Sequence, residues 1–151
     1  MKKYIGVLCI GLLALGCTKQ DLVLDVKALA NQSKREVHHL LGQPDSIYIT
    51  PILHKKVYTE LYFSEKYQVE LLYSSDTTVN EIKVNNPVGL PFAPSALAKF
   101  GLPSDVKPTK QEENLTIIWN DLEGFKRVNI FTQRLDSTGK PEKYTIYFRV
   151  Q

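Results

Sequence analysis

Cysteine is scarce in this sequence, and both cysteines stand near its beginning. They are Cys9 and Cys17, so the rest of the 151-residue chain can form no disulfide and offers no thiolate ligand for zinc. A domain of this size buries enough apolar surface to fold without such cross-links. We therefore expect one ordinary domain that is stabilised by packing alone.

The chain also lacks a large excess of charge of either sign. The chain has 19 basic residues against 16 acidic ones, and two of the basic residues, Lys2 and Lys3, belong to a segment interpreted below as a signal peptide. The remaining 17 basic and 16 acidic residues give a net charge of +1. Nucleic-acid-binding domains carry a strongly basic patch. The composition therefore predicts that nucleic acid is not a partner.

The sequence also lacks the common catalytic motifs, with no Gly-x-Ser-x-Gly elbow, no His-Glu-x-x-His and no glycine-rich phosphate loop. Of its three histidines, His38 and His39 are adjacent and would point about 100° apart on a helix, and His54 is distant. We interpret the adjacent pair as solvated. Glu60 and Glu70 could face each other across a hairpin, but strand alternation favours a solvated face for Glu70. We expect no enzyme activity, no cofactor and no metal.

One apolar run is present, from Tyr4 to Leu15. It is shorter than the roughly 20 residues of a membrane-spanning helix, so we interpret residues 1–16 as a signal peptide. The run ends in Leu13-Ala14-Leu15-Gly16-Cys17, which resembles the lipobox of bacterial lipoproteins. The resemblance implies cleavage between Gly16 and Cys17, a diacylglycerol on the Cys17 thiol and an acylated N-terminus.

Such a modification predicts permanent anchoring, because each buried methylene contributes about 0.8 kcal/mol. Thr18 follows the cysteine. In enteric Gram-negative lipoproteins an aspartate there retains the protein in the inner membrane, so we expect the outer membrane, facing the periplasm. Residues 17–24 are predicted to be a lipidated tether, or in part the start of the first helix.

Short helices precede groups of strands. Residues 25–30 have the spacing of a helical turn, and Ser33 with Glu36 forms a capping box for a helix from Lys34 to Leu41. Gly42 is predicted to end that helix in a left-handed conformation, and Pro44 prevents its continuation. Alternating apolar residues then predict antiparallel strands at 46–50, 57–63, 67–73 and 79–84.

The pattern then begins again after a proline-rich joint at 85–93. Ser95 is predicted to cap a short helix that ends at Gly101, and strands follow at 115–120, 127–132 and 143–150. Several pairs of similar residues share an offset of 59 positions, namely Gly42 and Gly101, Pro44 and Pro103, Ile47 and Val106, Val69 and Val128, and Leu71 and Ile130. We therefore predict two helix-then-meander units, 25–84 and 94–151, although a helix ending in Gly-x-Pro can also recur by coincidence.

These units predict an α+β fold. Joining both meanders into one antiparallel sheet, with the short helices packed on one face, would bury the apolar residues of both units together in one compact domain covering 25–151.

One pattern in the first unit covers about half of the mature chain and consists of Ser33, Val37, Leu41-Gly42-x-Pro44, Tyr58 to Phe63, Val69 to Tyr73, and Ile82. In this pattern the unit resembles the SmpA/OmlA type of small lipoprotein, which includes a subunit of the machinery that assembles outer-membrane β-barrels. A tandem of such units is similar in layout to the β-lactamase inhibitor protein. That resemblance implies a concave sheet that grips a protein partner.

Aromatic residues on the strands are the best candidates for binding such a partner. Tyr58, Tyr62, Trp119 and Tyr147 are each out of phase with some apolar neighbours. They could cluster on an exposed face as protein interfaces favour, or they could be partly buried simply because aromatic residues suit strands.

The sequence thus predicts a lipid-anchored envelope lipoprotein that acts as a non-catalytic protein-binding or scaffolding module, with an envelope protein as its partner. The alternative is an inhibitor or immunity protein that blocks an enzyme. A third hypothesis is a hydrolase of envelope polymers.

Overall fold

The computed structural model describes residues 22–52, 55–74 and 77–151. The proposed signal peptide, the lipidation site Cys17 and His54 lie outside the described residues. Within the described ranges, no helix is long and apolar enough to cross a membrane.

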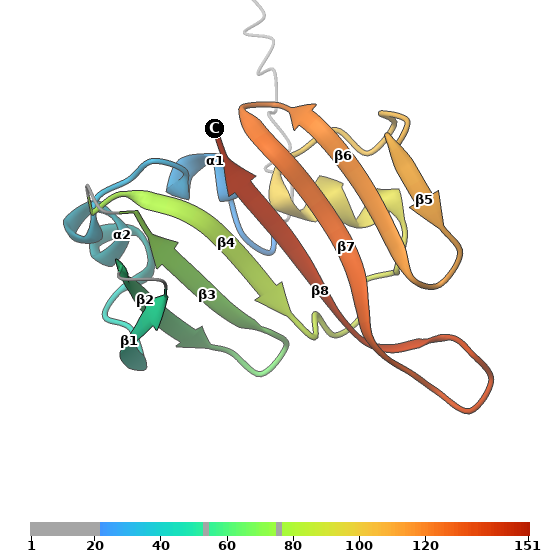
Figure 1. The fold of residues 1–151 in the computed structure, drawn as a ribbon, viewed down its shortest axis with the longest axis horizontal. Coiled ribbons are helices and arrows are strands. Elements are labelled where there is room, and N and C mark those ends of the chain that lie inside the picture. Colours follow the sequence, from blue (N-terminus) through green and yellow to red (C-terminus); the bar gives the residue numbers. More distant parts are fainter. Residues whose placement is uncertain (1–21, 53–54, 75–76) are drawn as a thin grey trace, which may run out of the picture.

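One antiparallel sheet dominates the fold (Figure 1). Its eight strands follow the spatial order β1-β2-β3-β4-β8-β7-β6-β5, so the last strands of the two meanders lie side by side at the centre. The single sheet expected from the sequence is therefore confirmed. The strands are β1 (Ser46–Ile52), β2 (Lys55–Phe63), β3 (Gln68–Tyr73), β4 (Val79–Asn85), β5 (Lys110–Glu112), β6 (Thr116–Leu122), β7 (Phe125–Leu135) and β8 (Pro141–Val150).

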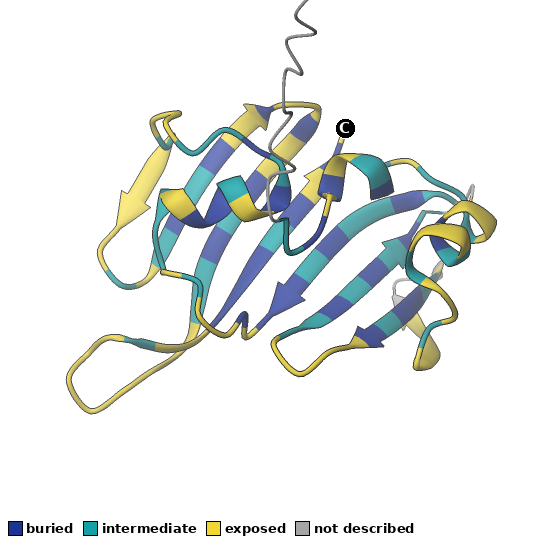
Figure 2. Ribbon diagram, turned by 180° about the vertical axis from the view of Figure 1, so that it is seen from behind, coloured by how far each residue is buried: buried dark blue, intermediate teal, exposed yellow. Residues whose placement is uncertain are grey.

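Within the described residues, helical structure is limited to three short segments, and the predicted α+β class is wrong: the fold is predominantly β. The segments are α1 (Val26–Leu29), α2 (Lys34–Leu41) and the 3-10 helix η1 (Pro94–Phe100). They lie over one face of the sheet (Figure 2) but are too short to form a layer. Each buries one to three side chains, and the strands supply most of the core. The helix signals in the sequence are local, whereas the class depends on how much of the chain the strands occupy.

The α2 helix has the predicted bounds and the predicted capping box. The Ser33 hydroxyl accepts a hydrogen bond from the Glu36 amide at 3.4 Å, and the Glu36 carboxylate accepts one from the Ser33 amide at 2.9 Å. Gly42 ends the helix with φ +84° and ψ −166°. Its φ is positive as predicted, but its ψ lies outside the left-handed helical region that Gly101, at φ +74° and ψ +19°, occupies.

Two local predictions need correction in the second half. Ser95 does not cap η1, because the N-cap is Ala93 and no side chain bonds the free amides there. Pro94, at the start of the segment, instead fixes a helical φ without needing a hydrogen bond to its nitrogen. Strand β5 was not predicted, since three polar residues carry no alternating pattern.

Equivalent residue pairs recur in the two meanders. In the first, Leu71 on β3 pairs with Ile82 on β4; in the second, Ile130 on β7 pairs with Ile146 on β8. Leu71 and Ile130 have the offset of 59 noted above, whereas their partners Ile82 and Ile146 are 64 positions apart. The duplication of residues 25–84 and 94–151 stays a prediction, and superposition of the two halves would test it.

The segments outside the two meanders pack against the sheet. In the 85–93 joint, the Val88 amide donates to the Lys66 carbonyl at 2.8 Å, and the Leu90 carbonyl accepts from the Tyr144 hydroxyl at 2.6 Å. The described end of the predicted tether packs as well, since the Val23 amide donates to the Lys99 carbonyl at 2.8 Å. The folded domain therefore begins before residue 25.

Candidate functional site

The four aromatic residues predicted to bind a partner are not brought together. Tyr58 and Tyr62 lie on the helix-bearing face, the first partly exposed and the second buried. Trp119 belongs to the core at 1% exposure, and its indole N–H donates to the Val106 carbonyl at 2.9 Å. Tyr147 lies on the opposite face of the sheet, next to Glu81. Each of the four is out of phase with some apolar neighbours in the sequence, but only the topology decides which face a strand turns inward.

A buried carboxylate organises the helix-bearing face beneath α2. The Glu60 side chain is completely buried on β2, and four groups contact its two oxygens. Oε1 lies 2.8 Å from Nε2 of His38 and accepts from the Tyr58 hydroxyl at 3.3 Å. Oε2 accepts from the hydroxyls of Tyr62 at 2.9 Å and Tyr73 at 2.6 Å. The cluster joins α2, β2 and β3 through one side chain.

These contacts decide the charge of the cluster. Burial alone raises the pKa of Glu60, but hydrogen bonds from Tyr73, His38 and Tyr62 outweigh burial and hold the pKa below its ordinary value. Burial and the bonds to Glu60 raise the pKa of both Tyr62 and Tyr73. Glu60 is therefore ionised at neutral pH and the tyrosines remain neutral donors.

The cluster pairs a histidine with a carboxylate, as many hydrolases do, but its geometry is that of a structural tie. Each Glu60 oxygen already has two partners, so the carboxylate has little capacity left for a substrate. Lys34 covers the cluster, with Nζ 3.0 Å from the centre of the Tyr58 ring. The interpretation of His38 as a solvated residue is therefore wrong, whereas His39 is exposed. The alternation Tyr58-x-Glu60-x-Tyr62 was the available signal.

The opposite side of the sheet, which we call the open face, carries an ordered row of polar side chains. Glu70 on β3 accepts from the Asn85 amide at 2.8 Å, and Asn85 in turn accepts from the Thr145 hydroxyl at 2.7 Å. The Gln133 amide donates to the same hydroxyl at 2.7 Å. The row crosses four strands, and Thr145 is only 1% exposed, so these side chains are held in fixed positions.

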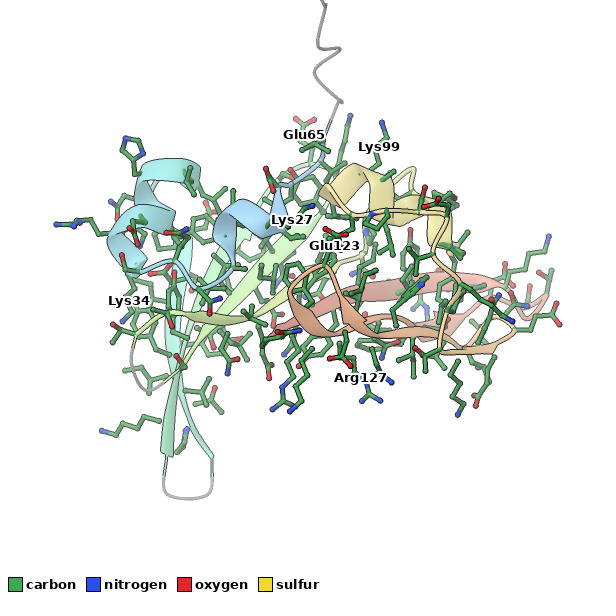
Figure 3. The ribbon with its side chains drawn as sticks, turned by 90° about the horizontal axis from the view of Figure 1, so that it is seen from above. Lys27, Lys34, Glu65, Lys99, Glu123 and Arg127 are labelled. Atoms are coloured by element: carbon green, nitrogen blue, oxygen red, sulfur yellow. The ribbon has the colours of Figure 1, made fainter. Side chains whose placement is uncertain are left out.

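Two arginines stand side by side on the open face. Arg127 on β7 pairs directly with Arg149 on β8, and both are exposed. Figure 3 shows Arg127 pointing away from the helical segments, on the side toward which the β1–β2 hairpin projects. A hollow of about 340 Å³ there is lined by Asn120, Asp121, Lys126, Arg127 and Arg149. Among the described residues, no carboxylate lies within 4.0 Å of either guanidinium.

Directly opposed like charges destabilise a sheet, and guanidinium groups bind carboxylates with two parallel hydrogen bonds. Glu81 on β4 stands directly opposite Arg149 in the sheet and offsets part of this repulsion, and both exposed guanidinium groups remain open to an anionic group from outside the chain. Within the described residues, no group of three histidine, cysteine, aspartate or glutamate side chains is placed to hold a metal ion.

Together the fold and these sites define a single-sheet, predominantly β protein with one covered face and one polar open face. No protein-family model, curated protein or solved structure matches the chain. The resemblances to the lipobox, to the SmpA/OmlA type and to the β-lactamase inhibitor layout stay predictions from the sequence.

Proposed function

We propose that this protein is a lipid-anchored lipoprotein of the bacterial envelope that binds another envelope protein through the open face of its sheet and has no catalytic role. The anchor is proposed from the lipobox sequence that ends at Cys17. The binding face is proposed from the polar row and the arginine pair.

The observation that carries the proposal is the preorganised open face. Side chains that are already fixed by mutual hydrogen bonds lose little conformational entropy when a partner binds. Arginine is enriched at the centres of protein interfaces, and the pair Arg127 and Arg149 has no described acidic partner within 4.0 Å. The projecting β1–β2 hairpin borders this face on one side (Figure 3), which favours a partner seated against the sheet.

An inhibitor that blocks an enzyme is the second candidate. The continuous face made where β4 joins β8 favours it, since one wide sheet can cover the mouth of an active site. A stable complex with a purified enzyme and loss of that enzyme's activity would distinguish an inhibitor from a scaffold. The hydrolase hypothesis has less support, because the one histidine–carboxylate pair described is the saturated cluster at Glu60.

Photo-crosslinking of the anchored protein in intact envelopes tests the binding face. A photoreactive amino acid at Asn129, on the open face, is expected to capture one discrete protein, and the same amino acid at the exposed Leu40 on α2 serves as the matched control. Arg127→Glu combined with Arg149→Glu should abolish the Asn129 product. Equal capture from both positions, or capture that survives the double substitution, would contradict the proposal.

Cys17→Ser tests the anchor. Without the thiol no diacylglycerol can be attached, so the chain should leave the membrane fraction and its mass should lack the acyl groups. Fractionation followed by mass spectrometry measures both, with Ser33→Ala, a change in the folded domain, as the control. Full membrane retention of the Cys17→Ser chain would refute lipid anchoring.

A further inference from the structure

The two edges of the sheet differ in how far they resist pairing with another strand. On one edge, β5 has three residues, Lys110, Gln111 and Glu112, and all of them are exposed. A short edge strand that carries charges discourages the addition of a further strand. This edge is protected.

The other edge, β1, lacks that protection. Its residues Ser46 to Thr50 carry no charge, and its register with β2 runs without a bulge. Three large apolar or aromatic side chains on it are exposed: Ile47 at 51%, Tyr48 at 40% and Ile49 at 57%. Pro51, which has no backbone N–H to offer, stands at the hairpin end and leaves the first five residues available for pairing. Such an edge is a template for strand addition.

We propose that β1 pairs in antiparallel fashion with β1 of a second copy of this chain, so that the sheet continues across a twofold axis. With the axis through Tyr48, Ile47 lies opposite Ile49 of the second copy, and Ser46 lies opposite Thr50. Apolar side chains thus meet apolar side chains on the helix-bearing face, and hydroxyl groups meet on the open face. Such an interface is isologous and closes after two copies.

Charges next to the strand agree with this register. Asp45 precedes β1 and stands opposite Pro51 of the second copy, and Pro51 itself pairs with Lys56 on β2. At each end of the ladder the Asp45 carboxylate, which accepts from the Phe63 amide of its own chain at 2.7 Å, therefore lies two strands away from the basic Lys56 of the other copy. No charge within Ser46 to Thr50 discriminates against a second copy of the same strand.

The pairing is small, so it belongs to the weak class of interfaces. Anchoring of all copies in one bilayer would raise their effective concentration, but the pairing itself needs neither the anchor nor the open face. If the open face binds no partner, the proposed pairing of β1 is unaffected. If β1 does not pair, the proposed binding through the open face is unaffected.

Cysteine cross-linking of the full chain in its envelope tests the pairing, because the chain has only two cysteines of its own, Cys9 and Cys17, and the natural chain oxidised in parallel shows what they contribute. In the proposed register Tyr48→Cys places two thiols on directly opposed residues, whose Cα separation of about 4.5–5.5 Å suits a disulfide. Mild oxidation should give a covalent product with twice the mass of the protomer. Gln111→Cys on the protected edge β5 is the matched control.

Ile49→Lys added to Tyr48→Cys should lower the cross-linked fraction about tenfold or more, since a charge would then sit inside the ladder. Gln111→Lys added instead should leave it unchanged. A Tyr48→Cys product no stronger than that of Gln111→Cys would overturn the proposal. So would a disulfide to a different protein, which would assign β1 to a partner's strand, or a dimer that survives Ile49→Lys.

Discussion

At the scale of single residues, the least expected feature is an ionised carboxylate with no exposure to solvent. Burying an isolated charge is strongly unfavourable, and Glu60 is accommodated because four side chains direct polar groups at it. Three of those groups are tyrosine hydroxyls, which donate hydrogen bonds without adding charge. The cluster is therefore a source of stability and also a point of vulnerability.

Glu60→Gln should lower the free energy of unfolding by about 2–3 kcal/mol, because the amide nitrogen replaces an acceptor with a donor among groups that donate. Urea unfolding measures the loss. Glu113→Gln, at an exposed position, is the control and should change stability by less than about 0.5 kcal/mol. Equal stability of the two variants would show that the cluster contributes nothing.

The same carboxylate predicts a dependence on pH. Because the pKa of Glu60 is lowered in the folded state, its contribution is fully present above the unfolded-state pKa of about 4.3 and is lost as the pH falls through the folded-state value. The difference in unfolding free energy between the natural chain and Glu60→Gln should therefore shrink between pH 7 and pH 3. A difference that stays constant or grows in acid would contradict the assignment.

At the scale of elements, the residues at which a helix begins and ends follow local sequence rules more closely than the type of helix does. The α2 helix begins at a capping box and ends at a glycine with a positive φ, and both features were visible in the sequence. The ψ angle of Gly42 was not visible in the sequence, because the path of the following chain into β1 sets that angle. Its combination of φ and ψ is one that is essentially restricted to glycine.

Gly42→Ala should therefore lower the free energy of unfolding by about 1–3 kcal/mol through backbone strain. Steric clash makes no contribution, because an added Cβ would meet no atom within 4 Å. Thermal unfolding checks the value. Ala98→Gly in η1 serves as the comparison, because it changes only the flexibility of the backbone. It should lower the free energy of unfolding by about 1 kcal/mol or less. An unchanged melting temperature in Gly42→Ala would remove the strain argument.

At the scale of the whole molecule, the two meanders share one core across the β4–β8 pair. Phe148 on β8 is fully buried, and its ring lies 5.5 Å from that of Phe100 and 5.7 Å from that of Phe125. The apolar side chains Ile82 and Val84 on β4 pair with Phe148 and Ile146 across the seam. The halves should therefore unfold together.

Phe148→Ala should destabilise the protein by about 3–5 kcal/mol and shift the whole transition. Fluorescence of Trp119, the single tryptophan, reports on the second half, and far-ultraviolet circular dichroism reports on the whole chain. The two transitions should coincide in the natural chain and in the variant. Phe63→Ala, at a side chain 56% exposed, is the milder control. Separate transitions would show that the halves are independent.

The sequence by itself determined the features that depend on neighbours along the chain. The capping residues Ser33 and Glu36, the position of α2 and seven of the eight strands follow from patterns a few residues long. The absence of cysteine after Cys17 likewise determined that no disulfide cross-links the described domain.

Only the tertiary structure decided which side of each strand is buried and what meets there. Glu60 acquires its partners from α2, β2 and β3, and Arg127 meets Arg149 only because β7 lies beside β8. Strand β5 exists because β6 offers it an edge, and the β class results from the total length of paired strand. These features depend on contacts between residues distant in sequence, which no local pattern specifies.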